Sequence, residues 1–64
     1  HGKHLINLFV LPDRENKDTA VETRTRQGFQ LVHWAQSGMA YWLVSDMSLQ
    51  ELIEFQRMLS SHTE

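Results

Sequence analysis

Three segments of the chain place apolar side chains on both faces of a β-strand. Successive side chains of a strand point to opposite sides of the sheet, so each segment divides into two alternating sets. In residues 4–12 these sets are Ile6, Leu8 and Val10, and Leu5, Phe9 and Leu11. Residues 28–36 and 39–45 repeat the pattern. Strands that are apolar on both faces are typical of sheets that are covered on both sides.

The best defined turn is Ser37-Gly38, which separates two apolar runs and predicts a β-hairpin over residues 28–46. With a two-residue loop, residues whose numbers sum to 75 face each other. One face then holds the pairs Trp34 with Tyr41 and Val32 with Leu43, and the other holds His33 with Trp42, Leu31 with Val44, and Ala35 with Ala40. One more residue in the loop would shift this register.

The residues between the first strand and this hairpin are mainly polar. Pro12 ends the first strand because it has no N–H for a ladder, and residues 13–18 predict a solvated loop. In residues 19–27, β-branched and charged residues alternate, which predicts an extended edge that leads into the next strand. The alternating residues are Val21, Thr23 and Thr25, with Glu22, Arg24 and Arg26. We interpret Gly28 as a β-bulge at the join.

The sequence Ser48-Leu49-Gln50-Glu51 is a capping box, in which the Ser48 hydroxyl accepts from the Glu51 amide and the Glu51 carboxylate accepts from the Ser48 amide. It predicts a helix over residues 49–60. The apolar stripe of this helix consists of Leu49, Leu52, Ile53, Phe55 and Leu59. We therefore expect an α+β fold over residues 1–64, as a single small domain or domain fragment. Its small antiparallel sheet has three strands, or more with residues 19–27, and is packed by one C-terminal helix.

One helix can cover only one face of the sheet, so the other face keeps its apolar side chains. Surface of that kind usually marks an interface or a missing element. The aromatic residues expected in the core or at such an interface are Phe9, Phe29, Trp34, Tyr41 and Trp42. If the Trp42 ring is buried, replacing it by Ala is expected to cost about 3 to 5 kcal/mol.

A chain of 64 residues buries only roughly 60% of its unfolded surface. It contains no cysteine, so association is the main support left to it. We expect a homo-oligomer formed through the open sheet face or a sheet edge, or pairing with the chain's own upstream segment. The second possibility follows from His1-Gly2-Lys3, a turn-like sequence that predicts a strand before it.

The residues that could carry chemistry are scattered. His1, His4, His33 and His62 lie in four different parts of the predicted fold, and their spacing is unlike that of a zinc site, so we expect no metal or cofactor. Ser37, His33 and Asp46 are the residue types of a nucleophilic site. However, Ser37 and Asp46 lie at opposite ends of the hairpin, roughly 25 Å apart at about 3.3 Å per residue. We do not expect an enzyme.

Two binding roles remain open at this point. The aromatic residues of the sheet could stack on bases, as in sheet-based RNA binders. The net charge of −2 argues against nucleic acid as the main partner. The alternative to a protein-contact module is therefore a free-standing β-sheet module that binds a ligand or nucleic acid through Trp34, Tyr41 and Trp42.

No apolar run approaches the roughly 20 residues of a membrane-spanning helix.

Three sequence segments and one helix resemble the C-terminal region of bacterial membrane-anchored anti-sigma factors. The segments are HGKHLINLFVLP at residues 1–12, GFQLVHW at residues 28–34 and GMAYWLVSD at residues 38–46. Residues 51–59 resemble the closing helix of that family. The likeness covers most of the chain except residues 13–27 and lies in the order and spacing of the segments. Leu11 departs from it, because many relatives have tryptophan before the proline.

The resemblance implies a regulator with three parts. These are a cytoplasmic N-terminal domain that holds an extracytoplasmic-function sigma factor, a single membrane helix, and an outer domain on the periplasmic side of the inner membrane. This chain would be the end of the outer domain and would act in signal transduction and transcription regulation through protein–protein contacts. The sigma factor and the membrane would be contacted only by parts outside this sequence.

Overall fold

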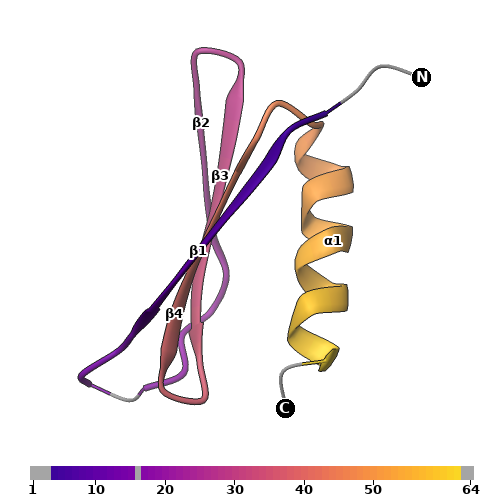
Figure 1. Cartoon of the computed structure of the whole chain (residues 1–64). Helices are drawn as coiled ribbons and strands as arrows, with labels where there is room; N and C mark the ends of the chain where they lie inside the picture. The colour runs from indigo at the N-terminus through magenta and orange to yellow at the C-terminus, as the bar shows by residue number, and fades with distance from the viewer. Residues whose placement is uncertain (1–3, 16, 63–64) are drawn as a thin grey trace.

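The computed structural model describes residues 4–15 and 17–62, which form a four-stranded antiparallel sheet with one helix packed against it (Figure 1). The elements are β1 (Ile6–Pro12), β2 (Glu22–Arg26), β3 (Phe29–Gln36), β4 (Met39–Ser45) and α1 (Leu49–His62). The order across the sheet is β1-β4-β3-β2, so β1 and β2 form the two edges. The expected α+β fold is confirmed, with residues 22–26 as the fourth strand.

Both hairpins close with two-residue turns in the left-handed conformation. The φ angles are 51° and 83° at Gln27 and Gly28, and 54° and 81° at Ser37 and Gly38. Two consecutive residues of this kind fit the type I′ turn, whose twist matches that of the strands. The predicted register around Ser37-Gly38 is confirmed, and Trp34 faces Tyr41. The bulge expected at Gly28 is wrong, because Gly28 is the second turn residue and supplies a positive φ.

Helix α1 begins at the predicted cap. The Glu51 amide donates to Ser48 Oγ at 3.2 Å, and the Leu52 amide donates to the Ser48 carbonyl at 3.0 Å. The Glu51 carboxylate accepts from the Ser48 hydroxyl at 2.9 Å. We expected this carboxylate to accept from the Ser48 amide instead. The helix ends at His62, slightly beyond the expected residue 60.

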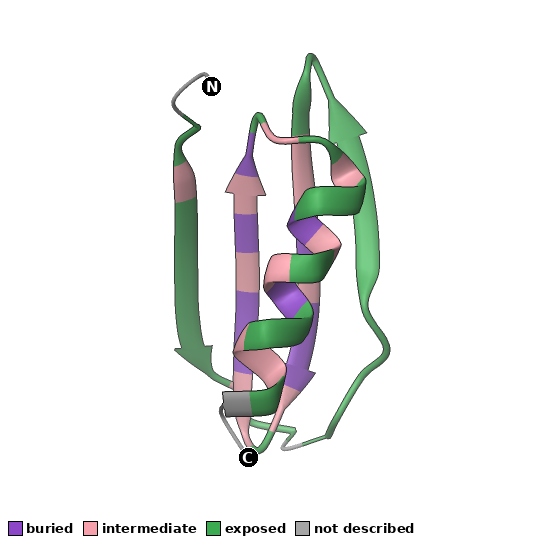
Figure 2. Cartoon of the chain, turned by 90° about the vertical axis from the view of Figure 1, so that its right-hand side faces the viewer, coloured by how far each residue is buried: buried purple, intermediate pink, exposed green. Residues whose placement is uncertain are grey.

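The hydrophobic core lies between α1 and the two central strands, and α1 lies over β3 and β4 (Figure 2). Its buried members are Val32, Trp34, Tyr41, Leu43 and Leu52. Partly buried side chains packed around them are Ile6, Met39, Leu49, Ile53, Phe55 and Leu59, which include the rest of the predicted helix stripe. At the other end of α1, Gln36 Nε2 donates to the Ser60 carbonyl at 3.2 Å.

The connection between β1 and β2 passes the β3–β4 turn at one end of the sheet (Figure 1). The Asp13 amide donates to the Gly38 carbonyl at 2.8 Å, and Asp18 Oδ1 accepts from the Ser37 amide at 3.0 Å. Thr19 then pairs with Ala35 along β3, because the Thr19 amide donates to the Ala35 carbonyl at 2.9 Å. These contacts hold the connection at the end and edge of the sheet. On the face opposite α1, Ala35 and Ala40 near this end are buried, whereas Phe9, Phe29 and Trp42 stay at least partly accessible.

Candidate functional site

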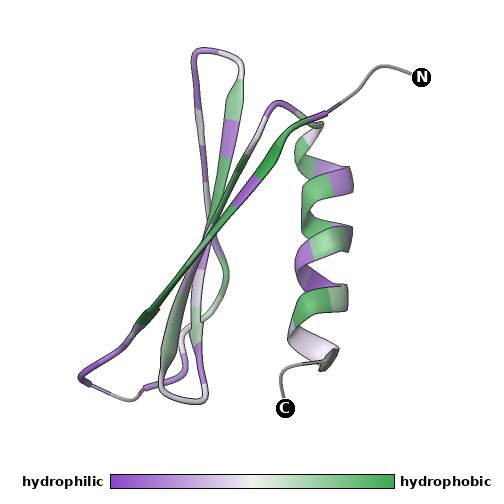
Figure 3. Ribbon diagram, viewed as in Figure 1, coloured by the Kyte–Doolittle hydropathy of each residue, from purple (hydrophilic) through white to green (hydrophobic). Residues whose placement is uncertain are grey.

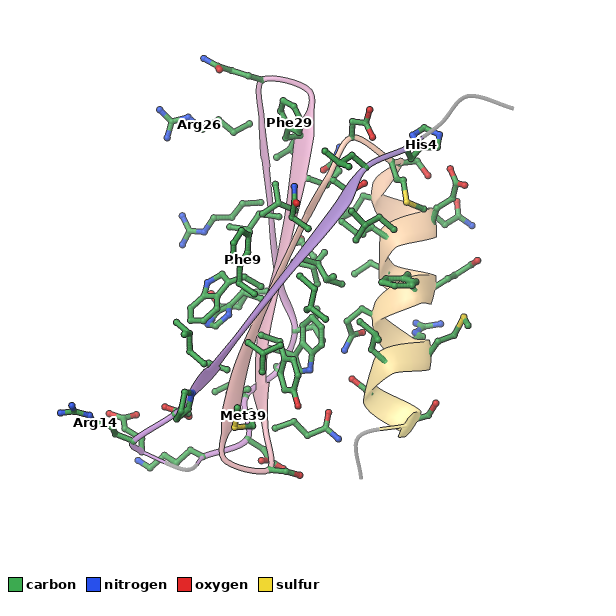
Figure 4. The ribbon with its side chains drawn as sticks, viewed as in Figure 1. His4, Phe9, Arg14, Arg26, Phe29 and Met39 are labelled. Atoms are coloured by element: carbon green, nitrogen blue, oxygen red, sulfur yellow. The ribbon has the colours of Figure 1, made fainter. Side chains whose placement is uncertain are left out.

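The sheet face opposite α1 is uncovered, and we call it the open face. Side chains on β3 and β4 alternate, and one alternating set forms the core with α1 while the other points away from the helix. The apolar and aromatic residues of the open face that remain at least partly accessible are Phe9, Leu11, Phe29, Leu31, His33, Trp42 and Val44. Figure 4 shows Phe9 on the side of the sheet away from α1. This face is a broad, mainly apolar surface.

The open face changes in character from one edge of the sheet to the other. Its middle row runs from Phe9 on β1 through Trp42 and His33 to Glu22 on β2. The next row runs from Asn7 through Val44 and Leu31 to Arg24, and Arg26 lies beside Phe29 at the far end. All three charged side chains belong to β2, which is hydrophilic, whereas β1 is hydrophobic along most of its length (Figure 3). The charges therefore form a rim beside an apolar centre.

An aromatic stack holds the centre of the open face. The His33 and Trp42 rings lie 4.3 Å apart between centroids and are inclined by 13°. His33 Nδ1 lies 2.7 Å from the Tyr41 carbonyl oxygen. Because a carbonyl oxygen can only accept, Nδ1 carries the proton, and this hydrogen bond fixes both the tautomer and the ring orientation. The stack presents a rigid, half-buried surface, which costs little side-chain entropy on binding.

A shallow groove of about 430 Å³ opens where the β2–β3 hairpin meets β4. Its lining residues are Arg24, Arg26, Gln27, Phe29, Gln30, Leu31 and Val44. Two guanidinium groups thus lie beside an apolar floor. Arginine is over-represented in protein interfaces because its planar group can both stack and donate several hydrogen bonds. A groove with this lining favours a partner that offers an apolar side chain and a neighbouring carboxylate.

The accessible apolar surface is concentrated at β1. Phe9 and Leu11 are each 55% exposed, and Leu5, which precedes the strand, is 70% exposed. Fully burying a large apolar side chain contributes about 1.5 to 3 kcal/mol. Each of these side chains therefore forgoes roughly half or more of that contribution while the face stays uncovered.

The structure separates the five aromatic residues that the sequence singled out. Trp34 and Tyr41 stack on each other in the core, at 4.9 Å between centroids. Phe9, Phe29 and Trp42 lie on the open face and are partly or largely accessible. The large cost expected for Trp42→Ala rested on a buried ring, and that condition is not met. It applies instead to Trp34, which is 2% exposed.

The residues considered for chemistry lie apart. His4 Nδ1 lies 3.2 Å from Asp46 Oδ1 in an exposed pair that joins the chain before β1 to the turn after β4. Ser37 lies in the β3–β4 turn, and His33 is engaged with Tyr41 and Trp42. His1 lies outside the described residues, and His62 ends α1. Within residues 4–15 and 17–62, His and acidic side chains form no group of three that could hold a metal ion.

The groove and its two arginines were not predicted as a site. A signal for them was present, since a two-residue turn at Gln27-Gly28 places Arg24 beside Leu31 and Arg26 beside Phe29. Because we interpreted Gly28 as a β-bulge, we did not expect this register, in which the two arginines lie beside Leu31 and Phe29.

Comparison with models of known protein families, with curated proteins and with solved structures gives no match. In the described part of the chain, no helix has the length and apolar character needed to cross a membrane.

Proposed function

We propose that this chain is the periplasmic C-terminal part of a membrane-anchored anti-sigma factor. In this role it regulates transcription dependent on an extracytoplasmic-function sigma factor through protein–protein contacts. The resemblance of residues 1–12, 28–34 and 38–46 supports the proposal. These segments include β1 and most of the β3–β4 hairpin, and so most of the open face. Residues 13–27, which the resemblance does not cover, include the charged edge strand β2.

The observation that carries the proposal is the open face itself. Centres of protein interfaces are rich in aromatic residues and poor in charge, and arginine is enriched around them. The open face has the His33–Trp42 stack at its centre, and Arg24 and Arg26 at its rim. A partner bound there, or released from it, changes the state of the periplasmic part. The membrane helix upstream passes this change to the sigma-binding domain.

The groove beside Phe29 favours one alternative, a free-standing module that binds a ligand or a nucleic acid. Two arginines beside an exposed aromatic ring are a known combination in single-strand binding. The net charge of −2 and the carboxylate of Glu22 on the same strand oppose it. Titration with single-stranded oligonucleotides and small aromatic compounds, followed by tryptophan fluorescence, separates the two functions. Saturable quenching of Trp42 supports the alternative, and its absence supports the regulator.

The coding sequence upstream of residue 1 gives the first test of the proposal. We expect it to encode one membrane helix preceded by a cytoplasmic domain, and an upstream sequence without a membrane helix contradicts the proposal. The second test uses the full-length protein in cells with a sigma-dependent reporter. Phe9→Asp places a charge on the open face and should change reporter output, whereas Met58→Asp, at an exposed position of α1, should leave it unchanged.

A further inference from the structure

The groove beside Phe29 is positively charged although the chain as a whole is acidic. It lies where the β2–β3 hairpin extends past the end of β4, because the pairing of β3 with β4 stops at Gln30 (Figure 1). Its lining includes Arg24 and Arg26 and no acidic residue. The net charge of the chain is −2. The groove is therefore a local site for an anion.

The chain itself does not neutralise the two guanidinium groups of the groove. Among the described residues, the one ion pair joins His4 to Asp46, so the carboxylate that follows β4 already has a partner. Glu22 lies two residues before Arg24 but opposite His33, and it does not line the groove. Both guanidinium groups are thus available to a carboxylate from another molecule.

The spacing of the two arginines favours such a carboxylate. Arg24 and Arg26 occupy alternate positions of β2, so both side chains leave the same face of the sheet, and their Cα atoms are about 6.6 Å apart. Figure 4 shows Arg26 pointing away from α1. Physiological salt screens charges over about 8 Å, so the two like charges still repel each other. An anion bound beside them lowers that repulsion.

The apolar floor of the groove suits one large side chain. Phe29 is 54% exposed, and Leu31 and Val44 are partly accessible. The volume of about 430 Å³ is similar to that of small-molecule sites, but such sites enclose roughly 70–90% of the ligand surface. This groove is shallow and leaves a free ligand largely in water. A side chain that is already held by a longer segment loses less by that exposure.

We infer that the groove binds an acidic segment of a partner protein, with one large apolar side chain on Phe29 and a neighbouring carboxylate on Arg24 or Arg26. An arginine can hold a carboxylate through two parallel hydrogen bonds, which fixes orientation as well as charge. A phosphate backbone fits less well, because it would meet only two cations and would pass Glu22 on the same strand. The inference rests on the proposed function, since it takes the open face as a protein-binding surface and names the chemistry of the partner.

The groove stays accessible if the strand expected before residue 1 is present. That strand would be joined to β1 by the turn-like sequence at residues 1–3 and would pair at the β1 edge. The order β1-β4-β3-β2 places the groove at the opposite edge of the sheet.

An NMR titration of the whole chain tests the inference, because it detects weak binding and locates it. The probe is a short peptide with blocked ends, in which glutamates flank one phenylalanine. The backbone amide signals of Phe29 and Leu31 and the side-chain Nε–H signals of Arg24 and Arg26 should shift, and those of α1 should not. A matched peptide with glutamine in place of glutamate should bind about threefold more weakly or worse.

Variants of the chain separate the charged and the apolar parts of the site. Arg24→Gln and Arg26→Gln should each raise the Kd of the glutamate peptide by about two- to fivefold. Arg57→Gln removes the same charge from an exposed position of α1 and should leave the Kd unchanged. Phe29→Ala should raise it by about fivefold. Phe9→Ala is the matched control, since Phe9 is 55% exposed on the open face but lies outside the groove.

Three results overturn the inference. The first is the absence of shifts in the groove at millimolar peptide, and the second is equal binding of the glutamate and glutamine peptides or an equal effect of Arg57→Gln. The third is a single-stranded oligonucleotide that shifts the same signals at lower concentration, which favours the nucleic-acid alternative. A failed titration with a reporter output that still responds to Phe9→Asp rejects the groove and keeps the proposed function. An output that does not respond rejects the proposed function.

Discussion

At the scale of single residues, the two tryptophans have different roles although they lie on neighbouring strands. Trp34 is 2% exposed and packs on Tyr41 beneath α1. Trp42 lies on the open face, half-buried, and stacks on His33. The sequence does not distinguish the two tryptophans, because each belongs to an alternating set of mainly apolar residues on its strand. The position of the helix alone makes one ring core and the other surface.

Replacing each tryptophan by Ala should therefore have unequal effects. Trp34→Ala removes the largest core side chain and should cost about 3 to 5 kcal/mol, enough to unfold a small domain. Trp42→Ala removes a half-buried ring and its stack on His33, and should cost about 1 to 2 kcal/mol. Urea unfolding followed by circular dichroism at equal protein concentration compares them. If Trp42→Ala is at least as destabilising, the open face is covered in solution.

The β2–β3 turn offers a second test at this scale. Gln27 has a φ of 51°, in the left-handed region that suits Asn better than Gln. Gln27→Asn should raise the free energy of unfolding by a few tenths of a kcal/mol or more. Gly28→Ala should lower the free energy of unfolding by about 1 to 2 kcal/mol, because alanine is strained at the positive φ of this position. A steric clash does not contribute, since a Cβ at Gly28 meets no atom within 4 Å. Thermal unfolding checks both, and a neutral Gly28→Ala would contradict the turn.

At the scale of secondary structure, the sequence predicts the elements better than it predicts their faces. The Ser37-Gly38 hairpin is recognisable because apolar runs flank it, and the α1 cap is recognisable from Ser48 and Glu51. Gly28 is ambiguous because glycine serves both bulges and type I′ turns. In the correct register, the charged side chains of β2 lie on the same face of the sheet as Trp42. Charges on that face would have indicated that it points away from the helix.

The cap at the start of α1 gives the prediction at this scale. Ser48→Ala removes the acceptor of the Glu51 amide and should lower the free energy of unfolding by about 1 kcal/mol. Ser61→Ala is a matched control near the other end of α1, where the hydroxyl donates only to the Met58 carbonyl. It should have little effect. Equal losses for the two variants in urea unfolding would mean that the cap does not stabilise the helix.

At the scale of the whole molecule, the fold has one covered face, one open face and two unlike edges. Natural domains of this size have stabilities of only about 5 to 15 kcal/mol. The accessible side chains of Phe9, Leu11 and Phe29 are each more than half exposed, and covering them would add on the order of 3 kcal/mol. Association through the open face would therefore add substantially to the stability of this chain.

Association of this kind should be visible in thermal unfolding. A folded state that binds a second copy is stabilised by mass action, so the unfolding midpoint should rise with protein concentration. Phe9→Asp should remove most of that rise, because it places a charge on the open face. Differential scanning calorimetry at several concentrations measures the effect. A midpoint that is constant over a wide dilution series would show that the monomer is stable on its own.

Site-specific photo-crosslinking in cells would show whether the open face makes protein contacts. A photoreactive phenylalanine analogue replaces Phe9 on the open face of the full-length protein, and Met58 on the outer side of α1 in a matched control. The label at Phe9 should join the chain to another protein or to a second copy, and the label at Met58 should not. Cross-links from Phe9 that are no stronger than those from Met58, or that join only nucleic acid, would contradict it.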